Sequence, residues 1–349
     1  MHALLIRHVF AGGFSFLLGL YLVPIVIKAA LKIGFVDAPD GKLKHQKQPV
    51  AYLGGVGVFI PFITTLGLCY PFDNMALWLL LGTTLLLFVG LIDDLKVLKP
   101  HQKFFGQCIA ALCFLKGEFS LKTPFFMATI ANMAASLFWM LTVINAFNLV
   151  DVMDGLCGTL ALCSAGIFLV CALAQGAYGA SLLLTAFIGA TAGFLVYNRP
   201  HAKIYLGDAG SMFIGGFLAA IPLFLSWGSP LFPSLATSGL YQEYALPLLQ
   251  MFFIPALVLA IPLVEVLGLF VIRTRLGIPF YNGSPHHFAI YLQKRCWSKW
   301  RVLSFAALCS VATGVLAIGF ALQYYPFLVV IKLLALGVAA WVLTVFVLQ

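Results

Sequence analysis

The chain has few acidic side chains, and five of them stand where long apolar runs meet polar connections. Only 11 of its 349 residues are Asp or Glu. The five at these boundaries are Asp93, Asp94, Asp151, Asp154 and Asp208. A carboxylate close to hydrocarbon is costly, so it is usually paired, bound to an ion or part of a substrate path. Each residue alone could be a solvated helix end, and Asp208 could cap a helix, but together they favour a shared site.

Such a group of carboxylates needs a cation, because neighbouring like charges repel. The sequence offers oxygen ligands without the His or Cys spacing of a zinc site, which favours Mg²⁺, with Mn²⁺ as an alternative. Magnesium commonly takes one or two carboxylates together with substrate phosphates. Together with the Lys, Arg and His residues of the same connections, this pattern predicts phosphate chemistry at a membrane surface.

The composition excludes a soluble protein. Hydrophobic residues make up 62% of the chain and charged residues 9%, whereas soluble domains carry roughly 25% charged residues. The mean hydropathy is +1.05. The eight Cys form no C-x-x-C pair, which indicates small apolar residues rather than a zinc site or a disulfide framework. We expect one integral-membrane domain over 1–349.

A membrane-spanning helix needs about 20 mostly apolar residues. Eleven segments qualify, although the short run that contains Gln107 is the weakest: 9–31, 51–70, 76–92, 104–117, 126–147, 157–176, 181–197, 209–227, 246–272, 302–322 and 325–347. If all cross, all but four of the 20 Lys and Arg lie on one side, which the positive-inside rule assigns to the cytoplasm. The net charge of +9 is then a topology signal and not a sign of nucleic-acid binding. Pro255 and Pro262 predict a tilt or kink in one run.

The predicted fold is therefore an all-α polytopic membrane protein with ten or eleven transmembrane helices and cytoplasmic active-site loops. Four segments then carry a family resemblance, in this order: GLIDDLKVLKPHQKFFGQ (90–107), NAFNLVDVMDG (145–155), IYLGDAGSMFIGG (204–216) and SPHHF (284–288). Together they resemble the polyprenyl-phosphate N-acetylhexosamine-1-phosphate transferases, and 36–59 resembles the first cytoplasmic loop of that family. The resemblance covers about residues 30–300.

The resemblance implies a reaction and a location. A UDP-N-acetylhexosamine would react with polyprenyl phosphate to give polyprenyl-diphosphate-sugar and UMP, the first membrane step of a cell-envelope glycan. The enzyme would be a Mg²⁺-dependent phosphoglycosyltransferase of the bacterial inner membrane with its active site on the cytoplasmic face. The lipid bilayer and both substrates are the expected partners, nucleic acid is not, and a homodimer stays open.

The resemblance also assigns roles to residues. Asp93 and Asp94 match an aspartate pair that handles the lipid phosphate, and Asp208 matches a magnesium ligand. The expected lining of the nucleotide-sugar and metal site, with Asp154 as a second metal ligand, is Asn145, Asn148, Asp151 and Asp154. Lys103 and Gln107 match substrate-binding positions, and His286 and His287 match a histidine motif. Lys47 is a further candidate phosphate ligand, although the basic stretch around it also fits the positive-inside rule.

Three positions depart from the family pattern. Val152 replaces a usual Gly, and Glu265 stands near a usual Asp, either as a retained carboxylate or as a helix–helix hydrogen-bond partner. SPHHF lacks the full triple histidine of the phospho-MurNAc-pentapeptide enzymes, which favours UDP-GlcNAc as the donor over the pentapeptide donor.

Two other classes of membrane protein are alternatives. An ion-coupled transporter would place its acids near the bilayer midplane, and an intramembrane prenyltransferase would carry D-x-x-x-D pairs.

Overall fold

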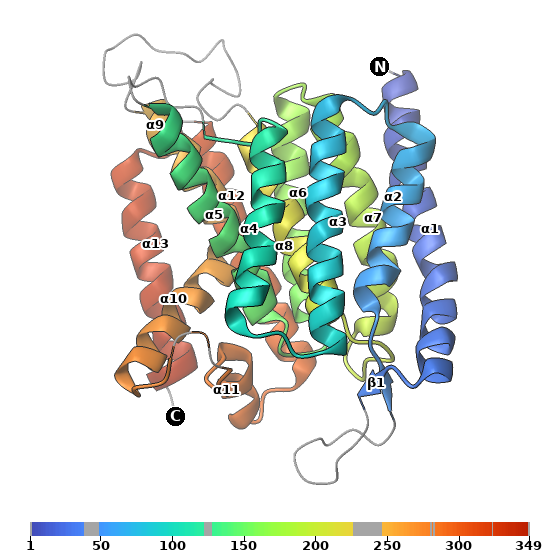
Figure 1. Ribbon diagram of the computed structural model, residues 1–349. Coiled ribbons are helices and arrows are strands. Elements are labelled where there is room, and N and C mark those ends of the chain that lie inside the picture. Colours follow the sequence, from blue (N-terminus) through green and yellow to red (C-terminus); the bar gives the residue numbers. More distant parts are fainter. Residues whose placement is uncertain are drawn as a thin grey trace.

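The computed structural model describes residues 2–37, 49–121, 128–225, 246–279, 281, 283–322 and 324–347. These residues form a bundle of helices (Figure 1). The first eight helices are α1 (His2–Ile33), α2 (Gly54–Cys69), α3 (Asn74–Leu95), α4 (Pro100–Lys116), α5 (Ala128–Val150), α6 (Leu156–Ala174), α7 (Tyr178–Asn198) and α8 (Gly207–Phe224). The others are α9 (Leu246–Val258), α10 (Ala260–Arg275), α11 (Phe288–Lys294), α12 (Lys299–Ala321) and α13 (Phe327–Val342), which Leu343–Val347 extends as a π-helix.

Eight of these helices are long and apolar enough to cross a membrane: α1, α3, α5, α6, α7, α8, α12 and α13. The protein is therefore a polytopic membrane protein, as the composition predicts. All eleven apolar runs contain helix in the described residues, and the weak run with Gln107 lies in α4, beside α3 and α5. Ten or eleven crossings, and the single domain over 1–349, stay predictions.

The run with two prolines is broken into α9 and α10 at Leu259, which lies outside both helices. A proline lacks the backbone N–H and clashes with the carbonyl group four residues earlier. For Pro262 that residue is Val258, where α9 ends. The kink predicted in this run is confirmed, as a break between two helices.

A short β-pair, which the apolar pattern did not predict, joins the entry to α2 with the entry to α8. Strand β1 (Val36–Asp37) runs antiparallel to β2 (Val50–Ala51), and Ala51 forms a parallel bridge with Ile204. The Ala51 carbonyl oxygen accepts the Tyr205 N–H at 2.8 Å. Helix α2 consequently begins at Gly54, three residues later than the run that predicted it.

Glycines let two helices touch the start of α8. A Cβ atom on Gly90 of α3 would overlap the backbone of Asp208 and Ala209, and one on Gly55 of α2 would overlap Gly210. Side chains larger than hydrogen would push these helices apart. The C-terminal end of α3, with its two aspartates, is thereby held against the first turn of α8.

Candidate active site

Lys103 on α4 is the centre of a polar cluster formed by four helices. Its Nζ lies 2.8 Å from Asp93 Oδ2 and 2.7 Å from Asp208 Oδ2, and it donates to Asn148 Oδ1 at 2.9 Å. Asn148 Nδ2 donates in turn to Asp208 Oδ1 at 2.7 Å. The structure thus brings together four residues that the sequence placed in one site, from α3, α4, α5 and α8.

The first turn of α8 is capped by carboxylates from elsewhere in the chain. Asp94 Oδ1 and Oδ2 accept the backbone N–H groups of Asp208 at 2.8 Å and of Ala209 at 3.1 Å, and Asp151 accepts the N–H of Gly207. Negative charge is favoured at a helix N-terminus, because the unpaired N–H groups carry partial positive charge there. Gly207 has φ +74, a left-handed conformation that glycine adopts without strain.

Asp151 follows α5 and carries the least compensated charge of the group. Burial raises the pKa of its carboxyl group, and the charges of Asp208, Asp94 and Asp154 raise it further. The N–H of Gly207 acts in the opposite direction but does not cancel these effects. The aspartates therefore leave an excess of negative charge that a cation would neutralise.

A pair of side-chain amides lies one turn deeper in the bundle. Asn145 Nδ2 donates to Gln107 Oε1 at 2.9 Å, and Gln107 Nε2 donates to Asn145 Oδ1 at 3.3 Å. Asn145 Nδ2 also donates to the Leu141 carbonyl oxygen at 2.7 Å. The two predicted substrate-binding amides thus bond to each other and join α4 to α5.

Asp154 has hydrogen-bond partners outside the Lys103 cluster. Its Oδ2 lies 2.6 Å from Lys299 Nζ and accepts the backbone N–H groups of His201 and Ala202 at 3.2 and 3.4 Å. The motifs of the sequence analysis do not include Lys299. The pairing assigns Lys299 a contact with the site that sequence reasoning missed.

The histidine motif contacts a different helix. His287 Nδ1 donates to Glu265 Oε1 at 2.9 Å, and the backbone N–H of Phe288 donates to the same oxygen at 3.3 Å. Both side chains are buried. Glu265 is therefore the hydrogen-bond partner of His287. His286 differs from its neighbour, because its buried Nδ1 has no hydrogen-bond partner among the described residues.

Two further side chains at the site escaped the sequence analysis. Ser211 accepts a hydrogen bond from Asn148 Nδ2 at 3.0 Å, and it lies three residues after Asp208 on the same helix face. Tyr52 has its ring centroid 5.8 Å from that of Tyr205. Burial raises the pKa of Tyr52 to about 12, and the charges of Asp37, Asp94, Asp208 and Asp151 raise it as well. The spacing from Asp208 could have identified Ser211, but nothing in the pattern identified Tyr52.

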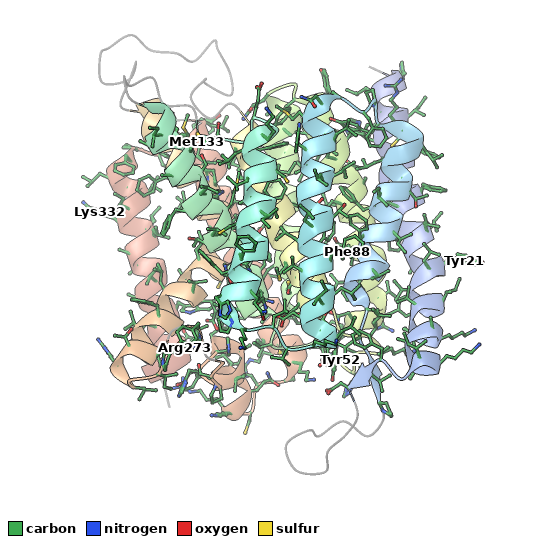
Figure 2. The ribbon with its side chains drawn as sticks, in the orientation of Figure 1. Tyr21, Tyr52, Phe88, Met133, Arg273 and Lys332 are labelled. Atoms are coloured by element: carbon green, nitrogen blue, oxygen red, sulfur yellow. The ribbon has the colours of Figure 1, made fainter. Side chains whose placement is uncertain are left out.

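Polar side chains gather at the end of the bundle that Tyr52 and Arg273 mark, whereas Lys332 lies away from it (Figure 2). We call this the aspartate end. Helix α3 ends there with Asp93 and Asp94, Asp151 and Asp154 follow the end of α5, and α8 begins there with Asp208. Within the described residues, no three His, Cys, Asp or Glu side chains are already arranged around a metal position. Lys103 lies between Asp93 and Asp208 instead. Lys47 falls within 38–48, outside the described residues.

Comparisons with known proteins show the family to which the chain belongs. The sequence model of the family described as "Glycosyl transferase family 4" matches residues 76–226, the segment from α3 to α8. A phospho-N-acetylmuramoyl-pentapeptide-transferase of Bacillus mycoides (strain KBAB4) is 29% identical over 320 residues, which cover 84% of this chain and 91% of the relative. One from Bacillus cytotoxicus is 31% identical over 241 residues, which cover 61% of this chain and 74% of the relative. The chain belongs to glycosyl transferase family 4.

Proposed function

We propose that this protein transfers N-acetylhexosamine 1-phosphate from a UDP-sugar to polyprenyl phosphate, with release of UMP. The observation that carries the proposal is the Lys103 ammonium group, held between Asp93 and Asp208 at the aspartate end of a family-4 membrane protein. A cation in such a position suits a reaction between two anions. A water-soluble nucleotide sugar and a lipid phosphate can meet there, because the aspartate end lies where the helices leave the bilayer.

The chemistry needs positioning and charge neutralisation more than a strong base. An oxygen of the polyprenyl phosphate attacks the β-phosphorus of the UDP-sugar, and the bond from that phosphorus to UMP breaks. A phosphate monoester is already largely ionised at pH 7, with a second pKa near 6. Both carboxylate oxygens of Asp94 accept hydrogen bonds from backbone N–H groups. This supports a positioning role for Asp94. Lys103 would offset the repulsion between the substrates.

Magnesium fits the residues at this end. The cluster offers oxygen donors and an excess of carboxylates over cations. Burial raises the pKa of Asp151 most, and the neighbouring carboxylates raise it further. We assign Asp208 and Asp151 as the side chains that would hold the ion. Asp154 would be a further ligand if its ion pair with Lys299 opens. When bound, Mg²⁺ would neutralise the diphosphate and stabilise the leaving UMP.

UDP-GlcNAc is the proposed donor. The short SPHHF segment, in which His286 and His287 lie, supports it over a donor that carries a peptide. A phospho-MurNAc-pentapeptide donor is the second candidate, because the relatives reported above carry that activity in their names. The distribution of Lys and Arg supports eleven crossings with the aspartate end in the cytoplasm of a bacterial cell.

The test is an assay of the purified protein with Mg²⁺, polyprenyl phosphate and a panel of UDP-sugars. We expect UMP release and a polyprenyl-diphosphate-sugar with UDP-GlcNAc, and loss of both when EDTA is added or the lipid is left out. The matched control is Asp208→Asn, which keeps the side-chain shape. Turnover only with UDP-MurNAc-pentapeptide would establish the second candidate. Binding of UDP-sugars without UMP release would contradict the proposal and favour a transporter.

A further inference from the structure

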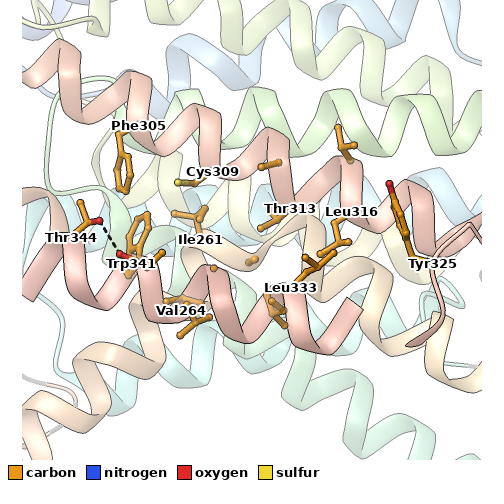
Figure 3. Close-up of a pocket in the computed structure, with 17 residues that line it drawn as sticks. Ile261, Val264, Phe305, Cys309, Thr313, Leu316, Tyr325, Leu333, Trp341 and Thr344 are labelled. Atoms are coloured by element: carbon orange, nitrogen blue, oxygen red, sulfur yellow. Dashed lines mark hydrogen bonds between the residues drawn. The ribbon is translucent and has the colours of Figure 1, made fainter. Parts of the chain in front are cut away.

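An apolar cavity of about 510 Å³ lies between α10, α12 and α13. Figure 3 shows its side chains facing one another across the three helices. Large apolar residues form most of its wall: Ile261, Val264, Phe305, Leu316, Leu333 and Trp341. Trp341 stacks on Phe305 with ring centroids 5.2 Å apart, which gives one end of the cavity a firm wall. The cavity therefore suits a hydrocarbon ligand.

The cavity is elongated along the helices. Its lining extends from Leu333 on α13 to Thr344 in the π-helix that follows, and from Phe305 to Leu316 on α12. Each stretch corresponds to about 17 Å at the rise of an α-helix. The hydrocarbon core of a bilayer is about 30 Å thick, so the cavity has about the depth of one leaflet. It extends from the aspartate end, where α12 begins and α13 ends (Figure 1).

The volume matches one acyl chain. An apolar cavity of about 150 Å³ holds one benzene molecule, so this cavity has room for about three times as many carbon atoms. That is the size of a phospholipid acyl chain, whereas a polyprenyl chain is several times longer. In the membrane-spanning stretch of α13 only 17% of the residues are buried. The surrounding lipid can therefore supply the chain.

A basic group lies at the end of the cavity that faces the aqueous phase. Arg295 Nη1 donates to the carbonyl oxygen of Thr344 at 2.7 Å, and Thr344 lines the cavity. A guanidinium group has five N–H donors, and such groups bind phosphates through paired hydrogen bonds. Arg301, which lies 4.1 Å over the Trp297 ring, adds positive charge nearby. This end favours an anionic headgroup.

The cavity is separate from the polar cluster. Helix α10 packs on α5, which carries Asn148, and it also faces the cavity with Ile261 and Val264. No residue of the Lys103 cluster lines the cavity. We propose that the cavity holds one acyl chain of an anionic phospholipid from the leaflet at the aspartate end, with its phosphate on Arg295.

The test is native mass spectrometry of protein purified in mild detergent from membranes that contain phosphatidylglycerol and phosphatidylethanolamine. Gly337 lines the cavity, and a Cβ atom built on it meets no atom within 4 Å. We expect Gly337→Phe to fill the space and to lower the co-purified phosphatidylglycerol about tenfold. The control is Gly13→Phe on α1, where a Cβ atom also meets nothing within 4 Å. It should retain the lipid as the wild type does.

A second pair of variants tests the headgroup. Arg295→Gln should weaken retention of phosphatidylglycerol about tenfold, because a charge-assisted hydrogen bond is lost. Lys294→Gln, an exposed neighbour, should not. If Gly337→Phe does not fold, delipidated wild type serves instead, and phosphatidylglycerol should raise its Tm more than phosphatidylethanolamine does. Equal retention in both glycine variants, no preference between the phospholipids, or polyprenyl phosphate as the retained lipid would overturn the proposal. UMP release is measured separately, so its failure would leave this result standing.

Discussion

Asp94 Oδ1 accepts the backbone N–H of Asp208 at 2.8 Å, so one aspartate of the site holds the backbone of another. The neighbour of Asp94 in the chain points elsewhere, because Asp93 lies 2.8 Å from Lys103 Nζ. Successive residues of an α-helix are about 100° apart around its axis, which lets one pair of aspartates serve two partners. Asp93 joins the charged cluster, while Asp94 fixes the direction from which Asp208 enters it.

We expect Asp94→Asn to lower both stability and UMP release. An amide can accept only one of the two backbone N–H groups and places its own NH₂ against the other, which should cost about 2 kcal/mol. A small displacement of Asp208 should lower kcat about 100-fold. Thermal unfolding and the UMP assay measure the two effects.

The control for Asp94 is Asp73→Asn. Asp73 Oδ1 accepts the Ala76 N–H at 2.7 Å and caps the other end of α3. Asparagine caps a helix about as well as aspartate does, so this replacement should change the Tm little and leave kcat unchanged. Full activity of Asp94→Asn at wild-type stability would show that the contact with Asp208 positions nothing.

Lys103→Gln should change metal binding and turnover in opposite directions. The ammonium group lies between Asp93 and Asp208, so a divalent ion at these carboxylates competes with it. Loss of a positive charge a few ångströms away is worth several kcal/mol at an effective dielectric constant near 20. We expect Mn²⁺ to bind at least about tenfold tighter, as measured by electron paramagnetic resonance, and UMP release to fall about 100-fold.

Lys116→Gln is the matched control, because Lys116 is exposed at the other end of α4, away from the Lys103 cluster. Its effect on Mn²⁺ affinity should be smaller. Weaker Mn²⁺ binding in Lys103→Gln would mean that Lys103 supports the metal site and does not compete with it.

Much of this site could be predicted from the sequence. Polar side chains at the ends of apolar runs are costly in hydrocarbon, so they are expected to gather at a polar site. The family resemblance predicted that Lys103, Asn148 and Asp208 belong to one site, and the apolar runs predicted the helices that carry them. The pattern could not separate the roles of Asp93 and Asp94, because that depends on how α3 is rotated against α8. It could not pair Asp154 with Lys299 either, since 145 residues separate them.

Gly90→Ala should destabilise the protein although alanine favours helix. The added methyl group would overlap the backbone of Asp208 and Ala209, and backbone atoms cannot move aside as a flexible side chain can. We expect a loss of about 1–3 kcal/mol and reduced UMP release, because α3 and α8 would separate. Gly13→Ala, where the new Cβ meets no atom within 4 Å, should keep or slightly raise the Tm, because alanine favours helix. Equal Tm values for the two variants would contradict the close approach.

His287 should contribute mainly to stability, and His286 mainly to binding of the UDP-sugar. His287 is buried and bonded to Glu265, so His287→Gln should cost about 1–3 kcal/mol, because a buried partner is left unsatisfied. A double-mutant cycle with Glu265→Gln should give a coupling energy of about 0.5–3 kcal/mol. His286→Gln should change stability less and KM for the UDP-sugar more, since His286 Nδ1 has no partner in the described part of the chain. A coupling energy near zero would separate His287 from Glu265.

Asp151→Asn should stabilise the protein in EDTA and abolish its response to magnesium. The carboxyl pKa is raised above its ordinary value of 3.8 by burial and by Asp208, Asp94 and Asp154, so the folded state binds more protons at Asp151 than the unfolded state does. The free energy of unfolding then falls as the pH rises above about 4, and the loss persists above the folded-state pKa. The amide has no charge to repel or to titrate, so the Tm of Asp151→Asn in EDTA should exceed that of the wild type at pH 7 and vary less with pH. Addition of Mg²⁺ should raise the Tm of the wild type only. The prediction would be contradicted if Mg²⁺ did not raise the Tm of the wild type and if its Tm varied with pH no more than that of the variant. Other groups of the protein would then neutralise the charge of Asp151.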